Sequence, residues 1–464
     1  MKRVTVVGGG LAGSEACWQL ASRGVAVDLY EMRPVQTTKA HKTGLCAELV
    51  CSNSFRGADL ANAVGLLKEE LRRLGSLVFE AADFAQVPAG GALAVDRDVF
   101  SRFIDQRIRE HPLITLHTEE IETIPEPDPS HPVIIATGPL TSPALSRSIE
   151  ELTGSGSLAF FDAISPILLN ESLDHEKLFR MSRYEKGGGD DYLNVPLSKE
   201  QYYTFVDEIL RAEKFGTHEE VEADLINNLR PFEGCMPIEE MAARGPDTLL
   251  FGPLKPVGLV DPHTGHRPYA VLQLRQDDKA GELWSMVGMQ TRMKHGEQMR
   301  VFRMLPGLEN CEFVRLGTVH RNTFIDSPKH LDPTLLFRTR PGLLFAGQIT
   351  GVEGYVESTA GGFVAGINAF RLINGQLPYV FSADTAIGSL MRYISDAERK
   401  EFQPMNINFG LMSSYFDELG GKKRGENKKD RRLRVAERAL LQIAEIRKEI
   451  GLEPLACAES AAAP

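Results

Sequence analysis

The sequence predicts an α/β fold built on a doubly wound parallel sheet, because three distant segments share one pattern. Residues 3–31 have the order strand, glycine turn, helix, strand that begins such a sheet. HPVIIATGP (131–139) and GLLFAGQITG (342–351) each read as an apolar strand that ends in glycines. We therefore expect these three segments to contribute strands to one sheet.

The first segment divides into three elements. RVTVV (3–7) is a β-branched run typical of a buried strand, and LAGSEACWQLASRG (11–24) has the apolar spacing of a helix closed by Gly24. VAVDLYE (25–31) predicts the next strand.

The residues between these strands are expected to form an inserted α+β unit. They mix short strand-like runs such as LWSMVGMQ (283–290) with the helical segment KEQYYTFVDEILRAEKF (199–215). GGGDDY (187–192) is interpreted as a flexible loop.

The C-terminal part is predicted to be helical. ESTAGGFVAGINAFRLIN (357–374) and LRVAERALLQIAEIRKEI (433–450) have helical spacing, and KKRGENKKDRR is interpreted as a charged connection into the second of these helices. We expect the tail ACAESAAAP to be disordered.

Composition limits the class of protein. The 464 residues are 42% hydrophobic and 25% charged, which is typical of a globular chain with two or three structural units. No apolar run approaches the roughly 18 residues of a membrane span. The opening MKRVTVVGGG also lacks the apolar stretch of a signal peptide, so a cytoplasmic protein without membrane contact is expected. Six cysteines without a CxxC pair predict free thiols, and no metal site is predicted.

The net charge of -11 disfavours nucleic-acid binding except at a local basic patch. From Lys422 to Arg434, KKRGENKKDRRLR holds eight basic residues against two acidic ones. Charge alone leaves two interpretations open, a phosphate-binding surface and a solvated helix start.

The glycines at the first turn predict a bound dinucleotide. Gly8 permits the tight turn, Gly10 lets the backbone approach a diphosphate, and Gly13 lets the helix pack on the strand. The diphosphate would sit on the helix N-terminus, and Glu31 would accept hydrogen bonds from both hydroxyls of the adenosine ribose. The binding residues expected here are Gly8, Gly9, Gly10, Leu11, Ala12, Gly13 and Glu31.

The later strands favour FAD over NAD as that dinucleotide. VIIATG (133–138) resembles the ATG strand of two-domain flavoproteins, and LLFAGQITG resembles their C-terminal motif, which approaches the ribityl chain and ring. A helix that begins near Glu357 would direct its positive end at the flavin pyrimidine. A second GxGxxG is absent, so NAD(P)H is expected to dock transiently. Further expected FAD contacts are Gly138, Gly347, Gln348, Gly351, Tyr355, Glu357 and Ser358, although Tyr355 could equally be a core residue.

The expected fold class is therefore a Rossmann-type (GR2-like) FAD-binding domain with an α+β insertion domain that closes over the flavin and a C-terminal helical segment. The corresponding ranges are 1–160 with 316–390 for the FAD-binding domain, 161–315 for the insertion, and 391–464 for the helical segment with its tail.

Six segments, in order, resemble the folate- and FAD-dependent tRNA (uracil-5-)-methyltransferase (TrmFO) family, from residue 1 to about residue 450. They are GGGLAGSEAC, ELVCSNSFRG, LRPFEGCMPIEEMA, FGPLKPVGL, VHRNTFID and GQITGVEGYVESTAGG. The resemblance implies formation of 5-methyluridine in the tRNA T-loop. It also implies methylenetetrahydrofolate as carbon donor, FAD as carrier and reductant, and NADPH or NADH to reduce the FAD. No obligate protein partner is expected.

The resemblance identifies Cys51 in ELVCSNSF and Cys235 in EGCMPIEE as the family's paired catalytic cysteines. Uracil C5 becomes nucleophilic when a thiolate adds to C6, and a second thiol can handle the C5 proton. We assign Cys235 as the nucleophile and Cys51 as the acid/base, and the reverse assignment stays open. Cys17 and Cys311 lie in runs typical of a core.

The resemblance also implies folate or substrate contacts at polar residues in QTRMKHGEQ and HRNT. A positive charge suits the folate glutamate tail, and an imidazole can stack on a pterin. These residues are Arg292, Lys294, His295, His320, Arg321 and Asn322, each of which could equally be an ordinary surface or core residue.

Three other functions are compatible with parts of this pattern. They are ribosomal RNA uracil methylation by the same chemistry, wobble-uridine modification with a partner GTPase, and small-molecule oxidation by an FAD enzyme. The chain length and the paired cysteines argue against the second.

Overall fold

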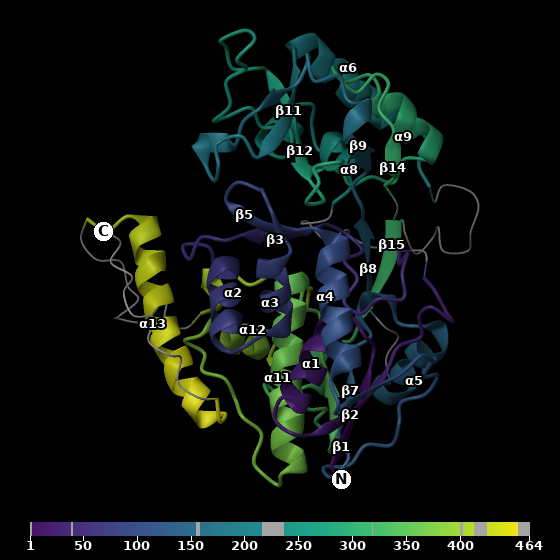
Figure 1. Cartoon of the computed structure of the whole chain (residues 1–464), viewed down its shortest axis with the longest axis vertical. Coiled ribbons are helices and arrows are strands. Elements are labelled where there is room, and N and C mark those ends of the chain that lie inside the picture. The colour runs from purple at the N-terminus through teal and green to yellow at the C-terminus, as the bar shows by residue number, and fades with distance from the viewer. Residues whose placement is uncertain are drawn as a thin grey trace.

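The computed structural model describes residues 2–38, 40–154, 158–215, 236–317, 319–399, 402–412 and 425–452. Its lower half in Figure 1 contains a five-stranded parallel sheet in the order β16-β7-β1-β2-β6. The strands are β1 (Arg3–Val7), β2 (Ala26–Tyr30), β6 (Ile114–His117), β7 (Val133–Ile135) and β16 (Leu343–Phe345). The prediction that three distant segments share one sheet is confirmed. Strand β6 was not predicted.

Two helices pack closely against each other beside this sheet, α1 (Leu11–Ala21) and α11 (Tyr355–Ile373). Glycines make the close approach possible. A Cβ atom on Gly362 would lie 2.2 Å from the carbonyl oxygen of Ala12, and one on Gly366 would lie 3.0 Å from that of Ala16. The helices therefore meet backbone to backbone, which joins two segments that lie far apart in the sequence.

Further helices and a small sheet complete this part of the molecule. The sheet has the order β3-β5-β4. The elements are β3 (Ser54–Gly57), β4 (Gln86–Val87), β5 (Ala92–Val95), α2 (Ala63–Arg73), α3 (Leu77–Phe84), α4 (Arg97–Glu110), α5 (Pro143–Thr153), α10 (Ser327–His330) and α12 (Ala386–Ser395).

The upper part in Figure 1 has a core of its own, around a six-stranded antiparallel sheet in the order β10-β11-β12-β13-β9-β14. Trp284, Tyr202 and Phe302 are fully buried there. Its strands are β9 (Ile167–Leu169), β10 (Phe179–Arg180), β11 (Tyr192–Leu197), β12 (Ala270–Gln276), β13 (Leu283–Met286) and β14 (Phe313–Arg315). Its helices are α6 (Lys199–Arg211), α8 (Ile238–Ala243) and α9 (His295–Phe302). The predicted helix and strand of the insertion are thus present as α6 and β13.

A two-stranded antiparallel ribbon lies between the two parts (Figure 1). It consists of β8 (Leu158–Ala163) and β15 (Val319–Phe324). The chain enters the upper part after β8 and leaves it before β15.

The last described helix, α13 (Lys428–Glu449), packs beside α2 (Figure 1). The prediction that residues up to 432 form a connection is wrong, because the helix begins at Lys428. Asn427 caps it by accepting a hydrogen bond from the backbone N–H of Asp430 at 2.9 Å. The predicted disordered tail lies outside the described residues.

The helices of the described part of the chain include none that is long and apolar enough to cross a bilayer.

Candidate active site

The turn between β1 and α1 has the geometry that its glycines predicted. Gly8 has φ +104°, and a Cβ atom there would lie 2.6 Å from the carbonyl oxygen of Ala136. A Cβ atom on Gly13 would lie 1.8 Å from the carbonyl oxygen of Gly8. A Cβ atom on Gly10 would meet nothing within 4 Å. Gly8 and Gly13 are therefore required for packing, whereas Gly10 leaves open space at the helix N-terminus.

Glu31 lies at the end of β2 beneath this turn and is already hydrogen-bonded. Its Oε2 accepts from the backbone N–H of Gly9 at 2.8 Å, and its Oε1 accepts from the backbone N–H and the Nε of Arg33 at 3.0 and 2.8 Å. Burial opposes ionisation of Glu31, but the hydrogen bonds and charge of Arg33 outweigh it, so the pKa of Glu31 is lowered. The carboxylate is ionised at neutral pH, with an acceptor position left on Oε2.

One cavity adjoins the turn, and a larger cavity shares a lining residue with it. The smaller, of about 70 Å³, is lined by Gly8, Gly10, Glu31 and Thr137 among others. The larger, of about 300 Å³, is lined by residues from both parts of the molecule, including Cys51, Gln290, Gln348 and Tyr355. Leu140, in the short helix Gly138–Leu140, lines both cavities. A dinucleotide-sized ligand could therefore extend from one to the other.

Cys51 differs from the other described cysteines in its exposure. It is partly exposed on the wall of the larger cavity, whereas Cys17, Cys46 and Cys311 are buried. Burial raises the pKa of all three buried thiols, that of Cys311 to about 11. Cys235 lies outside the described residues. The described chain resumes just after Cys235, and Ile238 lies three residues beyond it. The backbone N–H of Ile238 donates to the carbonyl oxygen of Gln290, a residue that lines the larger cavity.

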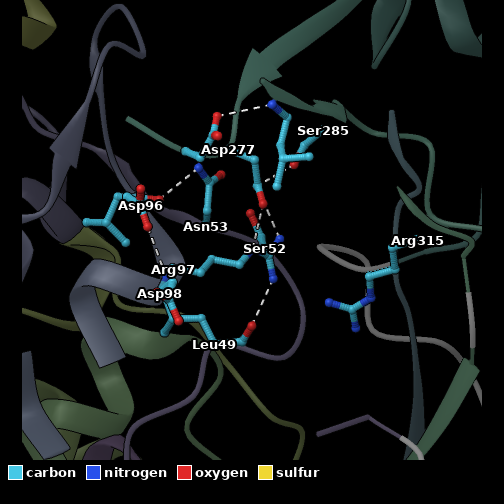
Figure 2. Close-up of polar contacts among 12 residues, drawn as sticks. Leu49, Ser52, Asn53, Asp96, Arg97, Asp98, Asp277, Ser285 and Arg315 are labelled. Carbon is cyan, nitrogen blue, oxygen red and sulfur yellow. Dashed lines mark hydrogen bonds and ion pairs between the residues drawn. The ribbon is translucent and has the colours of Figure 1, made fainter. Parts of the chain in front are cut away.

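The loop at 49–53 that carries Cys51 is held by three arginines. Arg97 donates to the carbonyl oxygen of Leu49 at 2.8 Å, and Arg315 donates to that of Val50 at 2.5 Å. Arg275 donates to the side chains of Ser52 and Asn53 at 2.9 and 3.0 Å. Figure 2 shows Arg97 between this loop and Asp277. Sequence reasoning missed these arginines, because they lie in three separate segments and no local motif marks them.

The N-terminus of α11 opens onto the same cavity, through Gly354, Tyr355 and Val356. The Tyr355 hydroxyl accepts hydrogen bonds from the backbone N–H groups of Cys51 and Ser52 at 2.9 and 3.1 Å. Tyr355 therefore fastens the cysteine loop to α11, a contact that the sequence did not reveal.

Other predicted residues of this region take different places. Gln348 lines the cavity and donates to Glu353 at 2.9 Å. Glu357 is fully buried, pairs with Arg56, and accepts from the backbone N–H of Ile407 at 2.9 Å. Gly347 and Gly351 have φ of +81° and +78°, and Ser358 is buried.

Three residues assigned to folate, Arg292, Lys294 and His295, are not among the described residues that line the larger cavity. Arg292 pairs with Glu240 at 2.7 Å, and Lys294 pairs with Glu213 at 3.1 Å. The His295 ring contacts that of Phe215 edge-on. Residues 320–322 pair with residues 160–162 between β15 and β8, and their side chains lie outside what is described. Ile164 and Ser165, which follow β8, line the cavity.

Comparison with known proteins identifies the family. The family model described as GIDA, "Glucose inhibited division protein A", matches residues 3–377. Methylenetetrahydrofolate--tRNA-(uracil-5-)-methyltransferase TrmFO of Listeria monocytogenes is 57% identical over 449 residues, which are 97% of this chain and 100% of that protein. The chain belongs to the TrmFO family. The TrmFO protein of Geobacter sulfurreducens is 56% identical over 440 residues, 95% of this chain and 98% of its own.

A solved structure shows the same fold. Aquifex aeolicus GidA matches with a TM-score of 0.69 at 18% identity, over 97% of this chain and 76% of that one. The fold of this TrmFO family member is thus an α/β fold of the GidA type.

Proposed function

We propose that the chain methylates C5 of a uridine in the tRNA T-loop, with methylenetetrahydrofolate as carbon donor and FAD reduced by NADPH or NADH. The position of Cys51 is the main structural support for this proposal. Cys51 is a partly exposed thiol in a cavity that receives the N-terminus of α11 and shares the lining residue Leu140 with the smaller cavity at the glycine turn of α1. The names of relatives that match at 57% identity over almost the whole chain support the same reaction.

FAD fits the described residues. Open space at Gly10, the ionised Glu31 and the shared lining residue Leu140 suit a ligand with a diphosphate between two bulky groups. We assign the diphosphate to Gly8, Gly9, Gly10, Leu11, Ala12 and Gly13, and the ribose to Glu31. The flavin and ribityl contacts are assigned to Gly138, Gly347, Gln348, Gly351, Tyr355, Glu357 and Ser358. When bound, FAD supplies electrons and carries the one-carbon unit.

The protein's own groups activate the uracil. We assign Cys235 to addition at C6 and Cys51 to the proton at C5, with the reverse as the alternative. Three arginines, Arg97, Arg275 and Arg315, bind the 49–53 loop that carries Cys51 and place positive charge around it. The hydrogen bond between Ile238 and the cavity-lining Gln290 supports a place for Cys235 at the same site. The target base must leave its stack to reach these groups.

We further propose that the chain consists of three structural units with different roles. Residues 1–160 with 316–390 bind FAD, residues 161–315 close over it, and residues 391–464 form the helical segment. Separate cores on the two sides of the β8–β15 ribbon support the first two units, whereas the C-terminal helices share the first core.

Folate contacts are proposed at Arg292, Lys294, His295, His320, Arg321 and Asn322. The protein is expected to work in the cytoplasm without an obligate protein partner.

The test incubates the FAD-bound protein with methylenetetrahydrofolate, NADPH and one RNA at a time. The RNAs are tRNA that lacks T-loop methylation and a ribosomal RNA fragment, and nucleosides are measured by mass spectrometry. We expect 5-methyluridine in the T-loop only. Flavin reduction without 5-methyluridine would overturn the proposal, and methylation of the ribosomal fragment alone would change the substrate.

A further inference from the structure

The loop of Cys51 is held from both parts of the molecule at once. Its Asn53 side chain donates to the carbonyl oxygen of Val95, which precedes α4, and to that of Gln276 at the end of β12. These distances are 3.0 and 2.9 Å. The loop is therefore enclosed between the start of α4 and the turn that follows β12.

Arg97 joins these two sides. It is the first residue of α4, and its Nε and Nη2 donate to the two carboxylate oxygens of Asp277 at 2.9 and 3.3 Å. Its Nη1 donates to the carbonyl oxygen of Leu49, and its Nη2 lies 3.5 Å from that of Cys51. Asp277 is 3% exposed and also accepts from the Ser285 hydroxyl at 2.6 Å. One guanidinium thus binds both the cysteine loop and a buried carboxylate of the other part (Figure 2).

A second contact at the same corner fixes the direction of α4. Asp96 caps the helix by accepting from the backbone N–H groups of Asp98 and Val99, and its other oxygen accepts from the backbone N–H of Lys279 at 2.9 Å. Residues 277 and 279 of one turn therefore bind residues 97 and 96 of one helix end. The pair is not an isolated surface contact, which would contribute little.

The groups that face Cys51 come from several elements. Arg97 of α4, Arg275 of β12, Arg315 of β14 and Tyr355 of α11 all interact with it electrostatically. Arg56 and Glu353 line the same cavity, and Asp277 pairs with Arg97. Removal of a neighbouring cation disfavours ionisation of a thiol, whereas removal of a neighbouring carboxylate such as Asp277 or Glu353 favours it.

From this geometry we propose that Arg97 is a positioning residue for Cys51 and that Asp277 acts through it. The pair holds the Cys51 loop between the two parts of the molecule and keeps the guanidinium charge beside the thiol. This role rests on the proposed methyl transfer, because Cys51 is assigned to that reaction. The geometry of the Cys51 loop can nevertheless be tested without RNA or folate.

The experiment measures how fast iodoacetamide alkylates Cys51 as a function of pH. The FAD-bound protein is used, and the peptide that contains Cys51 is followed by mass spectrometry. In Arg97→Gln the midpoint pH of alkylation is expected to rise by about 1 unit, because a neighbouring positive charge is removed. Arg97→Lys keeps the charge but cannot make the bidentate contact, so a smaller rise is expected.

Asp277→Asn separates positioning from simple charge. If Asp277 acted only as a nearby negative charge, its removal would lower the midpoint. If it holds Arg97 in place, the midpoint rises, as we expect. Arg102→Gln, which removes an exposed arginine paired with Asp98 on the same helix, is the matched control and is expected to match wild type.

Midpoints equal to wild type in Arg97→Gln and Arg97→Lys, or a lower midpoint in Asp277→Asn, would overturn the inference. If Arg97→Gln fails to retain flavin, Arg97→Lys and Asp277→Asn still decide it. Because no RNA is present in this experiment, its outcome is independent of the methyl-transfer assay. Absence of methyl transfer by the wild-type protein, together with the expected alkylation shifts, would contradict the proposed function alone.

Discussion

Glu31 and Arg33 form a buried ion pair at the nucleotide-binding turn. The side chains are 8% and 2% exposed, and Arg33 also lies 3.3 Å from Glu48. Because the pKa of Glu31 is lower in the folded protein than in the unfolded chain, the folded state binds fewer protons at acidic pH. Its stabilisation is therefore present above the unfolded-state pKa of about 4.3 and is lost as the pH falls through the folded-state value.

Glu31→Gln should lower the free energy of unfolding by about 3 kcal/mol at neutral pH, because it leaves a buried guanidinium partly unpaired. It should also reduce FAD content, since the ribose loses a charged acceptor. Chemical denaturation and flavin absorbance measure the two effects. Glu110→Gln, an exposed change on α4, should lie within about 0.5 kcal/mol of wild type. A stability difference that persists unchanged in acid would contradict the assigned titration.

Single residues differ in how far the sequence revealed them. The roles of Gly8 and Gly13 follow from local backbone geometry, so a short motif is enough to predict them. Arg33 lies two residues after Glu31, and its ion pair with Glu31 could also have been predicted, because a buried carboxylate needs a partner. Arg97, Arg275 and Arg315 meet only when the chain is folded, and no spacing in the sequence indicates that.

At the scale of elements, the packing of α1 on α11 depends on glycines in α11. Gly362→Ala places a Cβ atom 2.2 Å from the carbonyl oxygen of Ala12, so one helix must shift. We expect a loss of about 3 kcal/mol or more in the free energy of unfolding. We also expect weaker FAD binding, because both helices begin at the proposed cofactor site. Thermal unfolding and flavin titration measure these changes.

Gly296→Ala is the matched control, because a Cβ atom there meets nothing within 4 Å and the residue lies in α9. It should be neutral or should stabilise by up to about 1 kcal/mol. Equal effects of the two substitutions would show that helix contact is not the cause.

The start of α12 is bound by a buried carboxylate of α2. Glu70 of α2 is buried and accepts from the backbone N–H groups of Ala386 and Ile387 at 2.7 and 2.9 Å. Burial raises the pKa of Glu70 from 4.5 to about 8. Between these values the folded protein binds one proton more than the unfolded chain, so the free energy of unfolding falls as the pH rises through this window.

Glu70→Gln removes that titration and keeps one acceptor for the helix. Its stability relative to wild type should therefore improve from about pH 5 to about pH 8. Urea denaturation at several pH values measures the difference. Parallel stability curves for the two proteins would contradict a raised pKa at Glu70.

Elements with strong local patterns were predicted well. Apolar spacing and glycines in the sequence predict β1, α1, β2, β7, β16, α6 and α11. Strand β6 and the small β3-β5-β4 sheet were not predicted. Their runs of two to four residues are too short to show a period, and no apolar run that ends in a glycine turn marks them, as one marks β7 and β16. The predicted start of α13 is too late, because the charge of the segment outweighs the cap at Asn427 in the sequence pattern.

The chain as a whole is acidic, but a run of basic residues leads into α13. Lys428 and Lys429 are exposed there, and Lys429 lies 3.4 Å from Asp59. Replacing both by Glu should weaken tRNA binding. It should also reduce the slope of log affinity against log salt by about one for each phosphate group that the protein no longer neutralises.

Filter binding at several salt concentrations measures this slope, and kcat at saturating tRNA should change little. Lys177→Glu with Lys448→Glu makes the same change in net charge at other exposed sites and is the control. Equal salt slopes in the two double variants would contradict a docking role for the start of α13.

Isotope tracing can follow the transfer of a folate carbon to tRNA by this flavoprotein. The FAD-bound protein receives methylenetetrahydrofolate labelled with ¹³C in its methylene group, NADPH and tRNA without T-loop methylation. We expect the label in the methyl group of a single T-loop 5-methyluridine, as measured by mass spectrometry of RNA fragments. Recovery of unlabelled tRNA while NADPH still reduces the flavin would contradict transfer of the folate carbon to tRNA.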